Sequence, residues 1–89
     1  MEWRVELSSS AEKFLAKNHI PREEIFDLVA RAVRYFSGED ININIGKLSG
    51  AWEGFYRIRK GKLRIIVGFD FHSAFARVEV VDWRGSAYK

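Results

Sequence analysis

Residues 52–69 read WEGFYRIRKGKLRIIVGF, and they set the architecture that the rest of the chain must fit. Apolar and polar residues alternate along them, with a break at Lys60-Gly61. Alternation interrupted by a short glycine-containing break is typical of two strands joined as a hairpin. The sequence therefore predicts strands over Trp52–Arg59 and Lys62–Phe69, and a third strand over Arg77–Trp83.

The residues before this hairpin indicate one strand and two helices. Residues 3–7 alternate and predict a short strand. Ser9 and Glu12 form a capping-box pattern, which predicts the start of a first helix. Apolar residues recur at helical spacing over residues 25–36, so this segment predicts a second helix with one apolar face.

The isoleucines of residues 41–45 alternate as well, and this segment is either a further strand or an extended connector. Taken together, the pattern predicts a single domain over residues 1–89 of the α+β class. We expect two N-terminal helices packed on an antiparallel sheet, with the element order β-α-α-β-β-β.

Composition limits the class of protein. Hydrophobic residues make up 47% and charged residues 30% of the chain, as in ordinary globular domains. No apolar run approaches the roughly 20 residues of a membrane span. The chain has no cysteine, and its two histidines, His19 and His72, are far apart. We therefore expect a cytoplasmic protein without disulfides, without a metal site and without a cofactor.

Charge is distributed unevenly along the chain. Residues 1–40 carry a net charge of −2 and residues 41–89 carry +5, which gives the total of +3. A basic half of this kind favours a polyanion or an acidic protein as the partner.

The basic residues concentrate in the predicted hairpin, where Arg57, Arg59, Lys60, Lys62 and Arg64 occur with no acid among them. If Lys60-Gly61 is a two-residue loop, Arg59 faces Lys62 and Arg57 faces Arg64, on the side that Phe55 shares. Like charges directly opposite destabilise a sheet, so this arrangement favours an anion between them. Guanidinium groups bind phosphate in bidentate fashion. The alternative is a solvated face whose arginines pair with acids of the helices.

Other polar and aromatic residues have simpler interpretations. The serines of residues 8–10 are expected to cap a helix, because no histidine or glycine elbow accompanies them. Trp3, Trp52 and Trp83 are expected in the core or at its edge. Asp82 is expected to pair locally with Arg84.

Four motifs in the second half of the chain resemble the RelE/ParE toxin superfamily. They are Lys47-Leu48-Ser49-Gly50, Gly54-Phe55-Tyr56-Arg57-Ile58-Arg59, Gly61-Lys62-Leu63-Arg64-Ile65-Ile66-Val67 and the ending Arg84-Gly85-Ser86-Ala87-Tyr88-Lys89, which is especially similar to archaeal RelE. The resemblance implies the RelE-like microbial RNase fold. It also implies a toxin of a type II toxin–antitoxin pair, held inactive by a cognate acidic antitoxin in a hetero-oligomer.

The resemblance implies a reaction as well. RelE-type toxins enter the ribosomal A site and cleave mRNA without a metal, by attack of the ribose 2′-hydroxyl on the adjacent phosphate. By position, Arg64 matches the arginine that stabilises charge on that phosphate, and Arg57 and Arg59 match the residues that activate the hydroxyl. Arg84 matches the residue at the leaving oxygen, and Tyr88 matches a tyrosine that stacks on the substrate. The expected RNA-binding residues are Lys47, Phe55, Lys60, Lys62 and Lys89.

Two questions stay open at the level of sequence. Arginine does not release its proton, so the general base is Tyr88 or ribosomal RNA, or charge stabilisation alone carries the reaction. The chain could instead be similar in function to ParE-type toxins, which bind and inhibit DNA gyrase, or be an inactive member that only binds its antitoxin.

Overall fold

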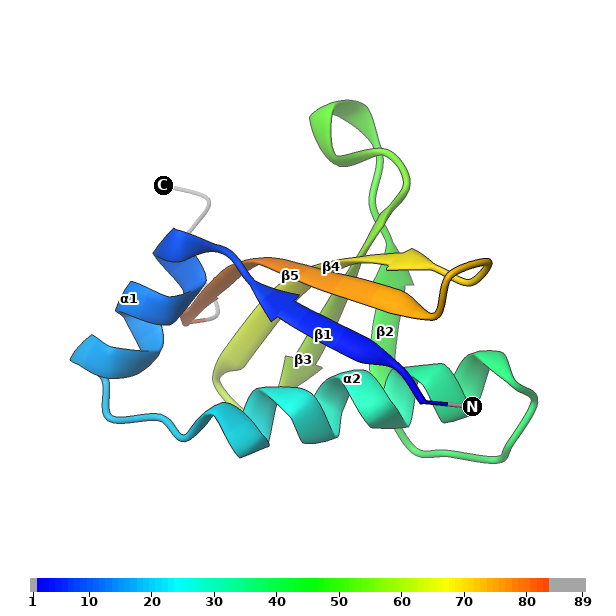
Figure 1. The fold of residues 1–89 in the computed structure, drawn as a ribbon, viewed down its shortest axis with the longest axis horizontal. Helices are drawn as coiled ribbons and strands as arrows, with labels where there is room; N and C mark the ends of the chain where they lie inside the picture. The colour runs from blue at the N-terminus through cyan, green and yellow to red at the C-terminus, as the bar shows by residue number, and fades with distance from the viewer. Residues whose placement is uncertain (1, 84–89) are drawn as a thin grey trace.

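The structure is a computed structural model and describes residues 2–83 of the 89-residue chain. Its elements follow one another as strand, two helices and four further strands (Figure 1). The strands are β1 (Arg4–Leu7), β2 (Asn44–Lys47), β3 (Phe55–Lys60), β4 (Leu63–Asp70) and β5 (Phe75–Trp83), the helices are α1 (Ser9–Lys17) and α2 (Arg22–Phe36), and a short 3₁₀ helix, η1, spans Gly50–Trp52. The predicted α+β class is confirmed.

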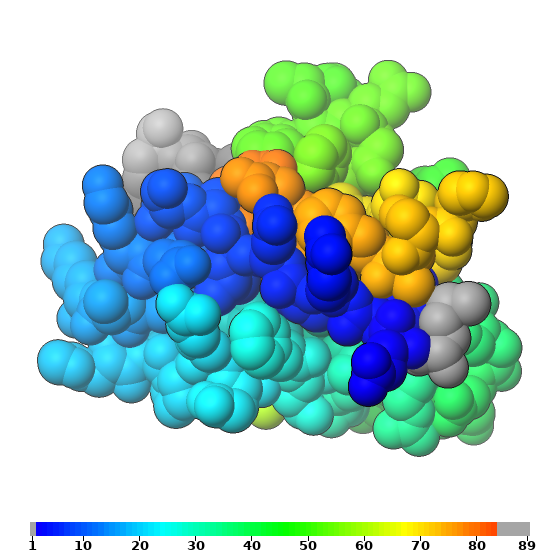
Figure 2. All heavy atoms as spheres, viewed as in Figure 1, coloured from blue at the N-terminus to red at the C-terminus, as the bar shows by residue number. Residues whose placement is uncertain are grey.

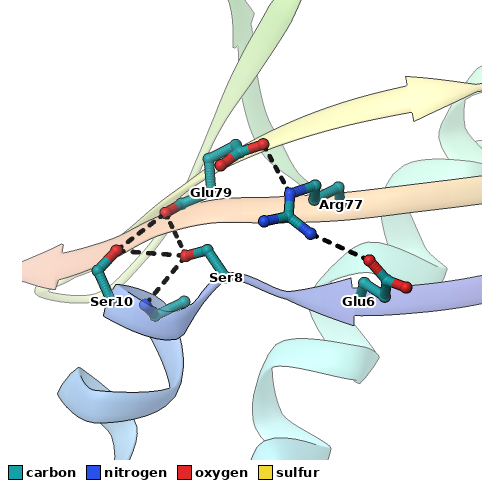
Figure 3. Close-up of polar contacts among 6 residues, drawn as sticks. Glu6, Ser8, Ser10, Arg77 and Glu79 are labelled. Atoms are coloured by element: carbon teal, nitrogen blue, oxygen red, sulfur yellow. Dashed lines mark hydrogen bonds and ion pairs between the residues drawn. The ribbon is translucent and has the colours of Figure 1, made fainter.

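Helix α1 has its N-cap one residue earlier than the sequence pattern predicts. The cap is Ser8, whose Oγ accepts a hydrogen bond from the Ala11 N–H at 3.1 Å, and not Ser9 paired with Glu12. The same Ser8 hydroxyl donates to the carbonyl of Glu79 on β5 at 2.7 Å (Figure 3). Ser8 is therefore favoured because one hydroxyl closes the first turn and also ties the helix to the sheet.

Helix α2 matches the predicted periodicity. Its first turn contains Glu23 and Glu24, whose carboxylates suit the positive end of the helix dipole. Gly38 follows the helix end with a φ of +97°, a conformation that glycine adopts without strain. The buried residues of the helix are Ile25, Leu28, Val29 and Ala32.

The strands form one five-stranded sheet in the order β1-β5-β4-β3-β2. The pairs from β2 to β5 are antiparallel, as predicted, whereas β1 runs parallel to β5, so the expectation of a wholly antiparallel sheet is wrong. Parallel neighbours need a long connection, and the chain between β1 and β5 supplies one that contains both helices. The segment of residues 41–45 is partly connector and partly strand, because residues 41–43 connect α2 to β2 and β2 begins at Asn44.

Both helices lie on the same side of the sheet (Figure 1). Alternate strand residues point to that side and form one core with the helices: Ala11, Leu15, Ile25, Leu28, Val29, Ala32, Ile58, Leu63, Ile65, Val67, Ala76, Val78 and Val81. The residues between them point to the other side, which we call the helix-free face. On the three central strands its residues include Phe55, Arg57, Arg59, Arg64, Ile66, Gly68, Arg77, Val80 and Asp82.

Candidate functional site

The β3–β4 hairpin differs by one residue from the predicted register. Lys60 pairs with Leu63, so the loop is Gly61-Lys62, and Arg59 lies opposite Arg64. The expected loop at Lys60-Gly61, with Arg57 opposite Arg64, is wrong. The reason lies in Gly61, whose φ is +60°. Two-residue hairpin loops of type II′ need glycine at their first position, and this register provides it.

Arg64 is a buried member of an ion pair. Its side chain is only 2% exposed. Its Nε and Nη2 donate to Oδ1 and Oδ2 of Asp82 at 3.1 and 3.0 Å, in the bidentate geometry that arginine favours. Asp82 lies directly opposite Arg64 on β5 and forms a cross-strand pair with it, whereas Arg84, its expected local partner, lies outside the described residues. A phosphate held between Arg57 and Arg64 does not fit this geometry.

Arg57 has a different environment on the same face. Its Nη2 donates to the Oδ1 of Asn44 on β2 at 3.3 Å, and no acid within residues 2–83 pairs with it. The guanidinium lies over Gly46, where an added Cβ would stand 3.0 Å from Nη2. Its Nε is shielded from solvent and has no hydrogen-bond partner in the described part of the chain. The Arg57 charge is therefore positioned by neutral groups and is available to an anion.

Arg59 completes the basic part of the face. It is half-buried and lies between Asn44 of β2 and Arg64 of β4 in the register of the sheet. Three arginines, Arg57, Arg59 and Arg64, thus occupy neighbouring positions on two adjacent strands, and Asp82 is the acid paired with the deepest of them. Such a cluster suits the binding of a phosphate by the two arginines of β3.

The other half of the helix-free face is charge-compensated. Arg77 on β5 donates from Nη1 to Glu6 Oε1 at 3.0 Å and from Nε to Glu79 Oε2 at 2.9 Å (Figure 3). Glu79 occupies an extra position, because the register shifts between Ile66 and Val67. A bulge of this kind re-aims a side chain, and here it brings a carboxylate beside Arg77. Arg57, on β3, lies outside this compensated half of the face.

An aromatic pair borders the arginines on β3. The Phe55 ring lies over Gly68 of β4, where an added Cβ would meet the ring at 2.9 Å. Trp52 packs edge-to-face against Phe55, with ring centroids 5.2 Å apart. Trp52 is 37% exposed and lies in the β2–β3 connection, neither in the core nor among the residues packed against it, so its expected place in the core or at its edge is wrong.

The structure brings together some of the predicted site residues and separates others. Phe55, Arg57, Arg59 and Arg64 share the helix-free face, as their alternation predicts. Lys47 and Lys60 pair with Tyr56 and Leu63, so the register assigns both lysines to the helix-covered side. Lys62 is an exposed loop residue. The remaining predicted residues, Arg84, Tyr88 and Lys89, lie outside the described residues.

Sequence reasoning missed several residues that shape this site. The sequence predicts a local partner for Asp82, because its partner Arg64 is distant along the chain, and Asn44 lies in a segment for which the sequence predicts either a strand or a connector. Gly46 and Gly68 did carry a signal, because glycine inside a strand often marks a close approach of another group. The groups that approach these glycines are the side chains of Arg57 at Gly46 and Phe55 at Gly68.

Within residues 2–83, no group of three or more histidine, cysteine or acidic side chains is arranged to hold a metal ion. Over the same range, no helix is long and apolar enough to cross a membrane.

The overall structure is similar to several solved toxins. YafQ from E. coli superposes with a TM-score of 0.68 over 99% of this chain and 100% of that one, at 13% sequence identity. The fold is that of the RelE and YafQ toxins. RelE in the RelB–RelE antitoxin–toxin complex of Methanococcus jannaschii gives a TM-score of 0.62 at 22% identity, over 93% of this chain and 94% of that one. A chain of the RelBE2 toxin–antitoxin complex of Mycobacterium tuberculosis gives a TM-score of 0.61 at 21% identity, over 94% of this chain and 100% of that one.

These likenesses concern the fold, and they confirm the resemblance to RelE that the sequence motifs indicate. By sequence, the chain matches no family model and no curated protein. The likeness to the RelE and YafQ toxins therefore rests on the short sequence motifs and on the three-dimensional structure.

Proposed function

We propose that this protein is the toxin of a toxin–antitoxin pair and that it cleaves mRNA on the ribosome. The observation that carries the proposal is Arg57, a cation without an acidic partner in residues 2–83, positioned beside Arg59 on the helix-free face of a RelE-like fold. A chain of calculated pI 9.5 with this cluster suits a polyanionic substrate.

The proposed chemistry is transfer of a phosphoryl group within the RNA strand. The ribose 2′-oxygen attacks the adjacent phosphorus, the bond to the 5′-oxygen breaks, and the products carry a 2′,3′-cyclic phosphate and a 5′-hydroxyl. Such a reaction depends mainly on positioning and on stabilising the negative charge that develops at phosphorus. Arginines supply that charge without a metal ion.

Each arginine has a distinct proposed role. Arg57 and Arg59 bind the scissile phosphate, and their positive charges stabilise the negative charge that develops on the 2′-oxygen as it attacks. Arg64 is proposed to assist from the adjacent strand, opposite Arg59, where Asp82 holds its guanidinium in place. Arg84 and Tyr88 are proposed to act at the leaving oxygen and on a base, as the resemblance implies.

The proposed partner is an acidic antitoxin. YafQ and RelE have been crystallised with the antitoxins DinJ and RelB. We propose a corresponding complex here, in the cytoplasm, with the antitoxin neutralising the basic half of the chain. A small acidic protein encoded beside this one would support the assignment.

The direct test adds the purified protein to a translating extract and maps the 5′ ends of the mRNA. Codon-phased cuts that require ribosomes are the expected result. Intact mRNA would overturn the proposal, and intact mRNA together with inhibited gyrase supercoiling would assign the protein to the ParE-like alternative.

A further inference from the structure

The connection between β2 and β3 stands clear of the body of the protein (Figures 1 and 2). It is a built loop. Leu48 N–H donates to the Phe55 carbonyl at 3.0 Å and closes its base, and Glu53 N–H donates to the Gly50 carbonyl at 3.1 Å within the turn. Gly50 and Gly54 have φ values of +67° and +94°, which favour glycine at both bends. These features give the loop a defined backbone shape, and Trp52 is the one aromatic residue within it.

Trp52 is positioned through two successive contacts. Phe55 is fixed over Gly68, because only glycine leaves room for a ring at 2.9 Å from the Cβ position. The Phe55 ring then supports Trp52 edge-to-face, with centroids 5.2 Å apart. An edge-to-face contact occupies the edge of one ring and one face of the other, so Phe55 leaves at least one face of the Trp52 ring uncovered. Trp52 retains 37% of its surface exposed in this arrangement.

The aromatic pair lies next to the phosphate-binding arginines. Phe55 and Arg57 are two residues apart on β3 and share a face, which separates them by about 7 Å along the strand. Proteins bind single-stranded nucleic acid by combining a cationic track for the backbone with aromatic side chains on which bases stack. Arg57 with Arg59 and Trp52 with Phe55 supply these two components in adjacent positions.

We propose that Trp52 is a base-stacking residue for single-stranded RNA, seated on Phe55 and placed beside the phosphate that Arg57 binds. This inference rests on the proposed function and deepens it, because it assigns a substrate contact to a loop outside the arginine cluster. Tyr88, which the resemblance assigns to stacking, belongs to a different segment of the chain.

In the alternative interpretation, Trp52 does not contact RNA and only covers the Phe55 ring. The two roles differ in what they affect. A cover contributes to folding stability and not to RNA affinity, whereas a stacking residue contributes to affinity and retains part of its effect when replaced by another aromatic residue.

The test compares Trp52→Ala and Trp52→Phe with a matched control, Tyr35→Ala, which removes an exposed aromatic residue from α2. Binding of a single-stranded RNA oligonucleotide is measured by tryptophan fluorescence and by filter binding. We expect Trp52→Ala to weaken binding about tenfold, since loss of one base stack has that order of effect. Trp52→Phe should retain most of the affinity but lose most of the fluorescence quenching, and Tyr35→Ala should bind as the parent does.

Cleavage on programmed ribosomes separates this inference from the proposed function. If the parent cleaves and Trp52→Ala cleaves and binds equally well, the stacking role is overturned and the proposed function stands. If the parent binds RNA with Trp52-dependent quenching but leaves mRNA intact, stacking is supported and the proposed cleavage is overturned. Loss of folding in Trp52→Ala with unchanged quenching in Trp52→Phe would assign Trp52 to the cover role.

Discussion

Arg64 and Asp82 lie directly opposite each other on β4 and β5 and are joined by two parallel hydrogen bonds of 3.1 and 3.0 Å. The arginine side chain is almost completely buried, whereas the carboxylate is 16% exposed. A buried cation of this kind is stable only while its partner remains. The pair therefore contributes to the stability of the sheet as well as to the charge of the helix-free face.

Removal of Asp82 should destabilise the protein. We expect Asp82→Ala to lower the free energy of unfolding by about 3 kcal/mol, because it leaves the Arg64 charge buried without this partner. Urea denaturation followed by circular dichroism measures the effect. The control is Glu6→Ala, which breaks the exposed ion pair with Arg77 and should cost less than about 1 kcal/mol. Equal effects of the two changes would contradict the buried-pair interpretation.

Arg57 should matter for cleavage and little for stability. Its contacts are a hydrogen bond to Asn44 and packing over Gly46, so Arg57→Ala should unfold within about 1 kcal/mol of the parent. Cleavage on ribosomes should fall by roughly a hundredfold or more, the effect of losing one charge-stabilising donor. Arg57→Lys should recover part of the activity, since it keeps the charge but not the bidentate geometry.

The matched control for this prediction is Arg22→Ala. Arg22 is an exposed arginine on α2 that pairs with Glu12, so the net charge changes equally while the helix-free face stays intact. Equal loss of cleavage in both variants would mean that net charge alone matters and that Arg57 has no specific role.

Gly68→Ala should displace Phe55. The added methyl group would stand 2.9 Å from the ring, and the ring must shift or turn away from β4. We expect a loss of about 1–3 kcal/mol in the free energy of unfolding, the usual effect of overpacking. The double variant Gly68→Ala/Phe55→Ala should show a smaller loss than the sum of the two single changes. Strict additivity in this thermodynamic cycle would show that the two residues do not contact.

The turn between β4 and β5 should contribute a small pH dependence. Hydrogen bonds from the Ser73 side chain, then from the Ser73 and His72 backbone N–H groups, lower the pKa of Asp70 below its ordinary value of 3.8. A carboxyl whose pKa is lowered on folding stabilises the fold above its unfolded pKa, and this contribution is lost as the pH falls through the folded pKa. The stability difference between the parent and Asp70→Asn should therefore shrink below pH 3.8.

Thermal unfolding of both proteins at several pH values measures that difference. Asp27→Asn, at an exposed position on α2, serves as the control for removal of one carboxyl. A stability difference at Asp70 that stays constant down to pH 2 would contradict the role of the ionised carboxylate.

The sequence predicts well what depends on local periodicity. Residues 25–36 repeat apolar positions at helical spacing, and the alternation along β3 and β4 assigns Phe55 and Arg57 to one face and Ile58 to the other. Each of these patterns has one arrangement that buries its apolar residues. The helix, the hairpin and the face of each side chain follow from it.

Pairing between distant segments could not be predicted in the same way. The one-residue difference in the hairpin loop follows from the backbone of Gly61, since a glycine can serve at either loop position of different turn types. Asp82 is eighteen positions from Arg64, and nothing in the periodicity of β5 indicates which basic residue it meets. The parallel direction of β1 likewise depends on the packing of the whole sheet.

That parallel pairing also constrains the order in which the protein can fold. β1 precedes every other element in the chain, yet within residues 2–83 its neighbour in the sheet is β5, the last strand. Helix α1 depends on the same strand, through Ser8 and through Phe14, whose ring packs against Trp83 at 5.4 Å. During synthesis, β1 therefore cannot pair in the sheet until β5 is available. Their pairing closes a long loop that contains all the elements between them. The ribosome that makes this protein has therefore translated all five strands before the product acquires the fold on which the proposed attack on ribosomes depends.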